Sequence, residues 1–249
     1  MLAHYLSPLR GHRENAVNSA SPHRRRDLRL LPKQLLVETG PVDHADWNSR
    51  LLLGWISRQR FRMVQSQLPP GRVGRLLEVG YGSGVFLPEL ALHARELYAL
   101  DIHERQHQVA RALAKHGVQA RLYSAMAEDM PFPARQFDTV VGVSCLEFMA
   151  DLDAAAREVT RVLTPTGVFI AVSPSTSRLI DAGFRLLTGK NPEDDFQGRR
   201  QRVLPTLLRY FEVEQRTVWP SGPMPLYSCL RLRPRRESSH ACNSARAAE

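Results

Sequence analysis

The chain has 249 residues, 43% of them hydrophobic, which suffices for one α/β domain with a buried core or at most two small domains. No window approaches the roughly 18 consecutive apolar residues that a bilayer-spanning helix needs, so no membrane-spanning helix is expected. The formal net charge is +9, but residues 1–45 and 231–249 contribute +3 each. The +3 that remains for residues 46–230 argues against a polybasic nucleic-acid surface.

The two ends of the chain differ in composition from the part between them. Residues 1–45 are predicted to form a mobile basic arm, and residues 235–249, rich in Ser, Arg and Ala, a disordered tail. The first 20 residues lack the apolar centre of a signal peptide, because Arg10, Arg13 and Glu14 interrupt them. A cytoplasmic location is therefore expected.

Helical and strand patterns alternate over residues 46–234, the expected domain. The helices are predicted at Asp46–Leu68, Val85–His93, Glu104–His116, Asp151–Leu163, Thr176–Leu187 and Val203–Tyr210. The strands are predicted at Arg75–Val79, Leu97–Leu100, Val118–Tyr123, Phe137–Val143, Val168–Val172, Phe211–Thr217 and Leu226–Leu232. Turns are expected at Thr164–Gly167 and, as a polar loop, at Asn191–Gly198. Such alternation predicts a mostly parallel sheet with right-handed crossovers.

A glycine-rich turn follows the first expected strand. Gly80, Gly82 and Gly84 can adopt positive φ and let the backbone approach a ligand without an intervening Cβ. The amides at the start of the next helix favour a carboxylate, while Glu78 beside the turn can hold an ammonium group. This end of the sheet therefore suits the charged head of an amino acid.

The second expected strand ends at Asp101, 21 residues after Gly80. A carboxylate at this point can accept hydrogen bonds from both hydroxyls of a ribose, so the turn and the acid together indicate an adenosine site. The pattern G-x-G-x-x-G of dinucleotide folds would put its third glycine at Val85. An acidic residue two positions ahead of a G-x-G-x-G turn is instead typical of methyltransferases.

At this point the sequence resembles the class I S-adenosylmethionine-dependent methyltransferases, especially their small-molecule branch. The resemblance runs from about Leu76 to Pro174 and implies a Rossmann-like, seven-stranded, mostly parallel sheet with helices on both faces. Five segments carry it, in order and at the family's spacing: Leu77 to Gly84, Leu100 to Ile102, Ala127 to Phe132, Phe137 to Val141, and Arg161 to Gly167.

The resemblance also implies a set of binding residues for S-adenosylmethionine. Glu78 and the loop residues Val79, Gly80, Tyr81, Gly82 and Gly84 would hold the methionine part, Asp101 the ribose, and Ile102 would pack on the adenine. Met126, Ala127 and Glu128 would line the adenine edge, and Ser144 would close the methionine end. Because Met126 stands where the family usually has an acid, the adenine amino group is expected to meet the backbone or Asp129.

Three further motifs have a structural interpretation. Residues 103–107 match H-E-x-x-H, but the motif starts at a strand-end turn and has no third ligand, so no metal site is expected and His103 is assigned to the rim of the cleft. Cys145 follows the fourth strand without the Pro-Cys pair of base-modifying methyltransferases, and a [DN]-P-P-[YF] signature is absent. The odd set Cys145, Cys229 and Cys242 predicts neither a disulfide framework nor a zinc knuckle.

These patterns predict a methyltransferase that uses S-adenosylmethionine and acts on a small-molecule acceptor rather than on nucleic acid. A general base is optional, and Glu147 and Tyr81 are the nearest candidates by position, so no catalytic residue is assigned. Two alternatives stay open. One is a non-catalytic methyltransferase-like binding module. The other is a nicotinamide-dependent oxidoreductase, although this sequence has no Ser/Tyr-x-x-x-Lys pair beside the fourth strand. The acceptor and the oligomeric state do not follow from the sequence.

Overall fold

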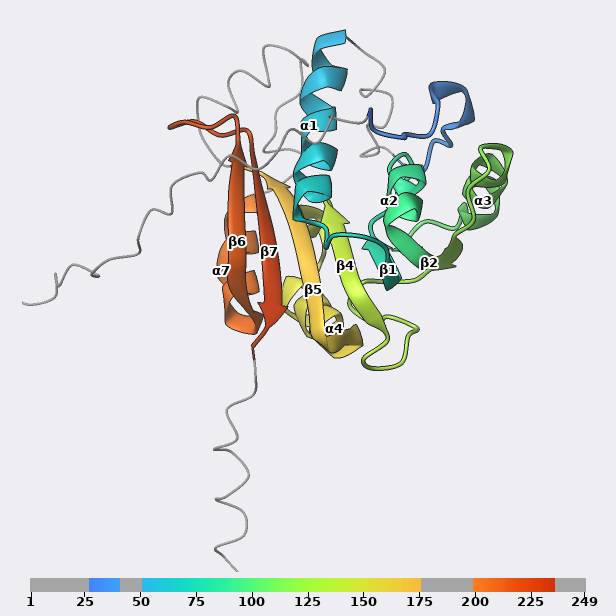
Figure 1. Ribbon diagram of the computed structural model, residues 1–249. Helices are drawn as coiled ribbons and strands as arrows, with labels where there is room; N and C mark the ends of the chain where they lie inside the picture. Colours follow the sequence, from blue (N-terminus) through green and yellow to red (C-terminus); the bar gives the residue numbers. More distant parts are fainter. Residues whose placement is uncertain (1–26, 41–50, 176–198, 236–249) are drawn as a thin grey trace, which may run out of the picture.

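The computed structural model describes residues 27–40, 51–175 and 199–235. Figure 1 shows a single twisted sheet with helices on both of its faces. The predicted helix at Thr176–Leu187 and the predicted loop at Asn191–Gly198 lie outside the described residues, as do residues 1–26, 41–50 and 236–249. Of the helices in the described part of the chain, none combines the length and the apolar character that crossing a bilayer requires.

The sheet has seven strands in the order β3-β2-β1-β4-β5-β7-β6, and β7 runs in the opposite direction to the other six. The order along the chain reverses between β1 and β4, which lie side by side. In open sheets of this kind, ligands bind beyond the carboxyl ends of the strands at such a reversal. The strands are β1 (Val73–Val79), β2 (Ala94–Asp101), β3 (Arg121–Ser124), β4 (Phe137–Val143), β5 (Leu163–Pro174), β6 (Phe211–Trp219) and β7 (Tyr227–Pro234).

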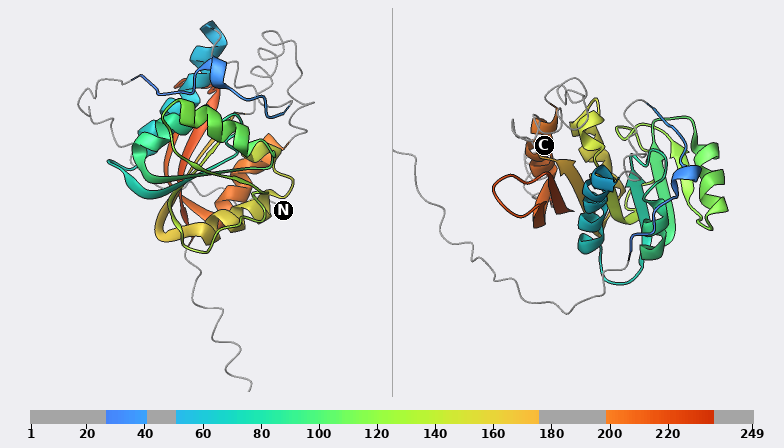
Figure 2. Two further views of the ribbon diagram at one scale, coloured as in Figure 1. Left: turned by 90° about the vertical axis from the view of Figure 1, so that its right-hand side faces the viewer. Right: turned by 90° about the horizontal axis from the view of Figure 1, so that it is seen from above.

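The central strands are buried because both faces of the sheet are covered by helices. Successive side chains point to opposite faces, so Leu76 of β1 joins one hydrophobic core and Leu77 joins the other. One core holds α1 (Leu51–Gln67), α2 (Leu87–His93) and α3 (Gln106–Lys115), and the other holds α4 (Leu152–Val162) and α7 (Arg200–Tyr210). Figure 2 shows the sheet between these two layers.

The predicted fold class is confirmed, with seven strands at the expected places in the chain. The turn expected at Thr164–Gly167 is wrong, because β5 already begins at Leu163. That residue pairs with Phe137, and an irregularity in the ladder before Thr139 accommodates Pro165 within the strand. Conversely, Val118 lies outside β3, since its N–H donates to Leu113 and helps to close the end of α3.

Residues 27–40, which the sequence assigns to the mobile arm, lie against α2. The N–H of Leu31 donates to the carbonyl of Val85 at 3.0 Å, and the Leu31 side chain is buried in the core. The N–H of Arg29 donates to the buried Glu89 carboxylate at 2.8 Å. This stretch therefore packs on the domain, while the division of the chain at residues 45 and 234 stays a prediction.

Candidate functional site

A cavity of about 540 Å³ lies at the carboxyl ends of β1, β2 and β4, where the strand order reverses. All but one of the residues that the sequence assigns to cofactor binding line it. The residues that do so are Glu78, Val79, Gly80, Tyr81, Gly82, Asp101, Ile102, Met126, Ala127, Glu128 and Ser144. The residue that does not is Gly84. The sheet thus brings together segments that are up to 66 residues apart in the sequence.

The glycine turn after β1 has the conformation that its composition predicts. Gly80, Gly82 and Gly84 have φ values of +75°, +50° and +75°. A Cβ on Gly80 would lie 2.4 Å from the Cβ of Cys145, so the close approach of two chain segments requires glycine there. A Cβ on Gly84 would lie 2.8 Å from Val109 of α3. Gly84 therefore serves the packing of a helix, which explains its place outside the cavity lining.

Asp101 at the end of β2 is tied to the glycine turn. Its Oδ2 accepts a hydrogen bond of 2.8 Å from the Gly82 N–H, and its Oδ1 accepts one of 3.4 Å from the His103 N–H. Each carboxylate oxygen has further acceptor capacity, which can serve a ligand hydroxyl. The acid is thus held in place by the same turn that forms the opposite side of the site.

His103 fixes this arrangement from the rim of the cavity. Its Nδ1 accepts a hydrogen bond of 3.0 Å from the Arg105 N–H, so the ring proton is on Nε2. Nε2 then donates to the Gly82 carbonyl at 2.9 Å, and the ring packs edge-on against Tyr81, with a centroid distance of 4.9 Å. Across the described residues, no group of three or more His, Cys, Asp or Glu side chains could hold a metal ion.

Glu78 is the buried acid of the site. Its side chain is only 3% exposed, and its Oε2 has no hydrogen-bond partner among the described residues. Desolvation, assisted by the negative charge of Asp101, raises the pKa of Glu78 to about 8, whereas Arg60 opposes the rise. A carboxyl group held in this way suits a cationic ligand group, which would restore its charge and its missing hydrogen bond.

The side of the cavity that the sequence assigns to the adenine carries an exposed apolar surface. Ile102 is 69% exposed and Met126 is also exposed, as expected for side chains that a planar ring can cover. Glu128 uses its Oε1 to accept hydrogen bonds from the N–H groups of Ala150 and Asp151, at 3.1 and 3.2 Å. Asp129 is exposed and does not line the cavity, which leaves backbone groups to meet an adenine amino group.

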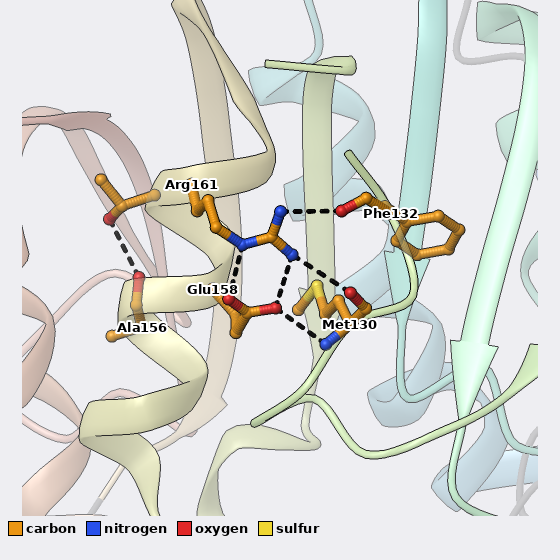
Figure 3. A network of polar contacts seen from close by, with 6 residues as sticks. Met130, Phe132, Ala156, Glu158 and Arg161 are labelled. Atoms are coloured by element: carbon orange, nitrogen blue, oxygen red, sulfur yellow. Dashed lines mark hydrogen bonds and ion pairs between the residues drawn. The ribbon is translucent and has the colours of Figure 1, made fainter. Parts of the chain in front are cut away.

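A network of hydrogen bonds that the sequence did not reveal holds the segment that follows Ala127 and Glu128. Figure 3 shows the guanidinium of Arg161 on α4 between the carboxylate of Glu158 and the backbone of two loop residues. Arg161 donates to the carbonyls of Phe132 at 2.7 Å and Met130 at 3.1 Å. Glu158 in turn accepts a hydrogen bond of 2.8 Å from the Met130 N–H. The pair thereby positions the loop that contains Ala127 and Glu128.

The turn after β4 forms the end of the cavity that the sequence assigns to the methionine part of the cofactor. Ser144 has a φ of +52°, its N–H donates to Val172 of β5, and its buried Oγ has no partner in the described structure. Cys145 donates its Sγ hydrogen to the Val79 carbonyl at 3.1 Å. Burial, and then the negative charge of Glu147, raises the pKa of the Cys145 thiol well above its ordinary value. Cys145 is therefore a packing residue and not a nucleophile.

The comparisons with known proteins agree with this geometry. Residues 77–171, from β1 into β5, match the family described as Methyltransferase domain. The central segment of the chain is thus similar to a methyltransferase domain.

Curated relatives of the methyltransferase domain are similar over part of their length. The putative methyltransferase YrhH of Bacillus subtilis is 28% identical over 124 residues, which cover 48% of this chain and 69% of YrhH. The ubiquinone/menaquinone biosynthesis C-methyltransferase UbiE of Paraburkholderia phymatum is 32% identical over 128 residues, which cover 49% of this chain. The match spans only 52% of that UbiE.

Solved structures share the fold at low sequence identity. The N-methyltransferase NodS from Bradyrhizobium japonicum, in complex with S-adenosyl-L-homocysteine, has a TM-score of 0.57 at 19% identity. The alignment covers 80% of this chain and 95% of NodS. The [4+2]-cyclase SpnF has a TM-score of 0.60 at 18% identity, covering 76% and 84% of the two chains. Proteins that share this fold therefore differ in activity, so the fold alone does not identify the reaction.

The part of the cavity away from Asp101 contains polar residues that sequence reasoning mostly missed. Arg60 and Ser57 enter it from α1, Tyr227 from β7, and Glu147 from the short turn η3 (Leu146–Phe148). Only Glu147 was considered from the sequence, as one of two positional candidates for a base. The spacing of Ser57 and Arg60, on the face of α1 that also carries Phe61, was the available signal, but it is equally typical of a solvated helix face.

Proposed function

We propose that the protein transfers the methyl group of S-adenosylmethionine to a small-molecule acceptor. The observation that carries this proposal is the convergence of Glu78, the glycine turn and Asp101 in one cavity at the reversal of strand order. An amino-acid head and a ribose are the two polar ends of the cofactor, and these residues supply a matching acid at each end.

The residues fit the cofactor by their chemistry. The orphaned Oε2 of buried Glu78 would meet the ammonium group, and the backbone at Gly80 and Gly82 would meet the methionine part without Cβ interference. Asp101 would accept the ribose hydroxyls, and exposed Ile102 would cover the adenine face beside Met126, Ala127 and Glu128. Val79, Tyr81 and Ser144 would complete the wall, with Gly84 acting indirectly through the packing of α3.

The protein's contribution to methyl transfer is alignment and the exclusion of water. S-Adenosylmethionine supplies a methyl group that is already activated by its sulfonium centre. The chain holds the acceptor in line with that group in a cavity whose walls come from α1, β1, β4 and β7. Proximity of this kind can account for a large share of a rate enhancement without any covalent chemistry by the protein.

A small molecule is the acceptor class that the site supports best. The cavity is bounded by protein on several sides, and the matched UbiE relatives are named for ubiquinone and menaquinone biosynthesis. The central part of the chain has a net charge of only +3, which provides little attraction for nucleic acid. A cytoplasmic setting belongs to the same proposal.

Isothermal titration calorimetry with S-adenosylmethionine, S-adenosylhomocysteine and NADH tests the proposed cofactor. We expect binding of the first two compounds and none of NADH. Binding of NADH alone would support an oxidoreductase instead. Incubation with methyl-labelled S-adenosylmethionine and a metabolite extract, followed by mass spectrometry, tests transfer. Tight cofactor binding without any labelled product would support the non-catalytic module.

A further inference from the structure

Six polar side chains around the cavity carry buried atoms that have no hydrogen-bond partner on another described residue. Four of them, Glu78, Tyr81, Ser83 and Ser144, lie in the part assigned to the methionine moiety. Arg60, through its Nε, and Glu147, through both carboxylate oxygens, lie in the remaining part. Buried polar atoms are rarely left without a partner, so a cluster of them around one cavity indicates a polar ligand.

Glu147 stands between these two parts of the cavity. It is 1% exposed and follows Ser144 by three residues, on the turn that leaves β4 beside β1. Its charge acts on Cys145, whose Cβ is the atom nearest to Gly80, and on Tyr227 of β7. Arg60 acts electrostatically on both Glu78 and Glu147. Glu147 is thus placed at the boundary between the methionine end and the rest of the cavity.

The charged groups around Glu147 come from several elements. Arg60 on α1 and Arg200 on α7 stabilise its ionised form, whereas Glu78 and Asp101 lie across the cavity on β1 and β2. Desolvation outweighs the two arginines and raises the pKa of Glu147 to about 7. A carboxyl group with this pKa is partly ionised at neutral pH, and its ionised form can accept a proton efficiently.

We infer that Glu147 is a catalytic residue of the proposed methyl transfer: its carboxylate receives the proton that the acceptor loses, and the acceptor carries a hydroxyl or an amine at the reacting atom. This inference rests on the proposed function. Arg60 and Tyr227 are then positioned to hold a second polar group of the acceptor.

The acceptor in this methyl transfer is written X–H, where X is oxygen or nitrogen. A lone pair of X forms the new X–CH3 bond, and the S–CH3 bond breaks with its electron pair remaining on sulfur. The X–H bond then breaks towards a carboxylate oxygen of Glu147, which leaves neutral methylated acceptor, neutral sulfur and a protonated Glu147. Release of that proton to solvent restores the ionised carboxylate for the next turnover.

Proton-linked calorimetry at pH 7 tests the position of Glu147 without an acceptor. S-Adenosylmethionine and S-adenosylhomocysteine share the amino-acid head, so Glu78 responds alike to both, whereas only the former has a sulfonium cation. If the sulfonium lowers the pKa of Glu147 by about one unit, binding of S-adenosylmethionine releases roughly 0.4 proton more than binding of S-adenosylhomocysteine. We expect this difference to vanish in Glu147→Gln and to persist in the surface control Glu96→Gln.

The outcomes separate the inference from the function on which it rests. Failure of S-adenosylmethionine to bind rejects the proposed function and the inference with it. Binding of both compounds with equal proton release in the wild type rejects the inference alone. The same holds for a difference that survives in Glu147→Gln, because another group must then face the sulfonium.

A transfer assay tests the chemical role. The probes are 13C-methyl S-adenosylmethionine with catechol, phenol or benzylamine, and the product is followed by NMR. We expect label on oxygen or nitrogen, a fall in kcat of about 100-fold or more in Glu147→Gln with little change in the KM for S-adenosylmethionine, and partial activity in Glu147→Asp. Equal kcat values in the wild type and Glu147→Gln overturn the role of the carboxylate. Failure of the wild type to label any of the three probes overturns the acceptor class.

Discussion

The backbone N–H of Gly82 donates a 2.8 Å hydrogen bond to the carboxylate of Asp101, across 19 residues of sequence. The turn after β1 and the end of β2 are therefore one unit, and His103 reinforces the link by donating to the carbonyl of Gly82. A substitution on either side of this unit is expected to affect both ends of the cofactor site.

Replacing Asp101 by Ala removes the acceptor of the Gly82 N–H and the proposed partner of the ribose. Because two charge-assisted hydrogen bonds to the ribose are lost, we expect S-adenosylmethionine binding to weaken by about 2–4 kcal/mol in calorimetry. Glu104→Ala, which removes an exposed acid three residues further on, should leave the affinity unchanged. An undiminished affinity of Asp101→Ala would contradict the ribose assignment.

Two glycines separate the effect of positive φ from that of close packing. Gly71 and Gly80 have φ values of +80° and +75°, but only Gly80 faces another atom where a Cβ would lie. We expect Gly71→Ala to lower the free energy of unfolding by about 1–2 kcal/mol, and Gly80→Ala to lower it by roughly 1–3 kcal/mol more. Urea unfolding measures both. Equal losses would show that contact with Cys145 does not matter.

The raised pKa of Glu78 makes cofactor binding depend on pH. The ligand ammonium requires the ionised carboxylate, which the ligand-free site loses as pH falls below about 8. We therefore expect the affinity for S-adenosylmethionine to fall from pH 8 to pH 6 by up to about tenfold per unit. In Glu78→Gln the affinity at pH 8 should be lower and its pH dependence flatter. A wild-type affinity that is constant over this range would exclude the ion pair.

The same two buried acids predict how stability changes with pH in the ligand-free protein. Their pKa values, about 8 for Glu78 and about 7 for Glu147, are raised above the value of 4.5 that applies to an exposed glutamate. Their neutral forms are favoured in the fold, so the stability present below about pH 4.5 is lost as pH rises towards 7–8, at up to about 1.4 kcal/mol per unit for each group.

The double variant Glu78→Gln with Glu147→Gln isolates this effect. It should be about as stable as the wild type at pH 5 and more stable, by several kcal/mol, at pH 8, as measured by urea unfolding at both pH values. Groups whose pKa is lowered in the fold, such as Glu158, are present in both proteins and cancel in the comparison. Parallel stability curves would show that these acids are ionised in the fold.

Substitution of Arg161 tests whether its hydrogen bonds position the loop that contains Ala127 and Glu128. Arg161→Ala leaves the carbonyls of Met130 and Phe132 without their donor and Glu158 without its cation. We expect a loss of about 1–3 kcal/mol in stability, together with weaker cofactor binding. Arg209→Ala, which breaks an exposed ion pair with Asp153, should cost at most about 1 kcal/mol. Equal effects of the two changes would argue against a positioning role for Arg161.

Local patterns predicted the parts of the site that lie next to each other in the chain. The glycine spacing and the acid at the end of β2 indicated the proposed cofactor site, because both lie directly at strand ends. The ligand roles assigned to these residues stay predictions until binding is measured. Gly84 illustrates a limit of this reasoning, since its conformation followed from the motif but its packing on Val109 depends on where α3 lies.

The remaining features depend on contacts between distant segments. Arg60 belongs to an N-terminal helix and Tyr227 to the last strand, and only the folded sheet brings them to the same cavity. The role of Arg161 could not be read from its motif because its partners are backbone carbonyls about 30 residues earlier. The strand status of Pro165 likewise required knowledge of how β5 pairs with β4 on either side of it, at Leu163 and Val168.

The packing of residues 27–40 on α2 has a practical consequence for the design of truncated forms of this protein. Glu89 is buried and shares its carboxylate between the Arg29 N–H and the side chains of Gln65 and His93. A recombinant fragment that starts at Asp46 would strip one of these donors away and uncover the pocket that Leu31 fills. Fragment boundaries chosen from sequence composition alone would thus yield a weakened domain, whereas a start ahead of Asp27 preserves it.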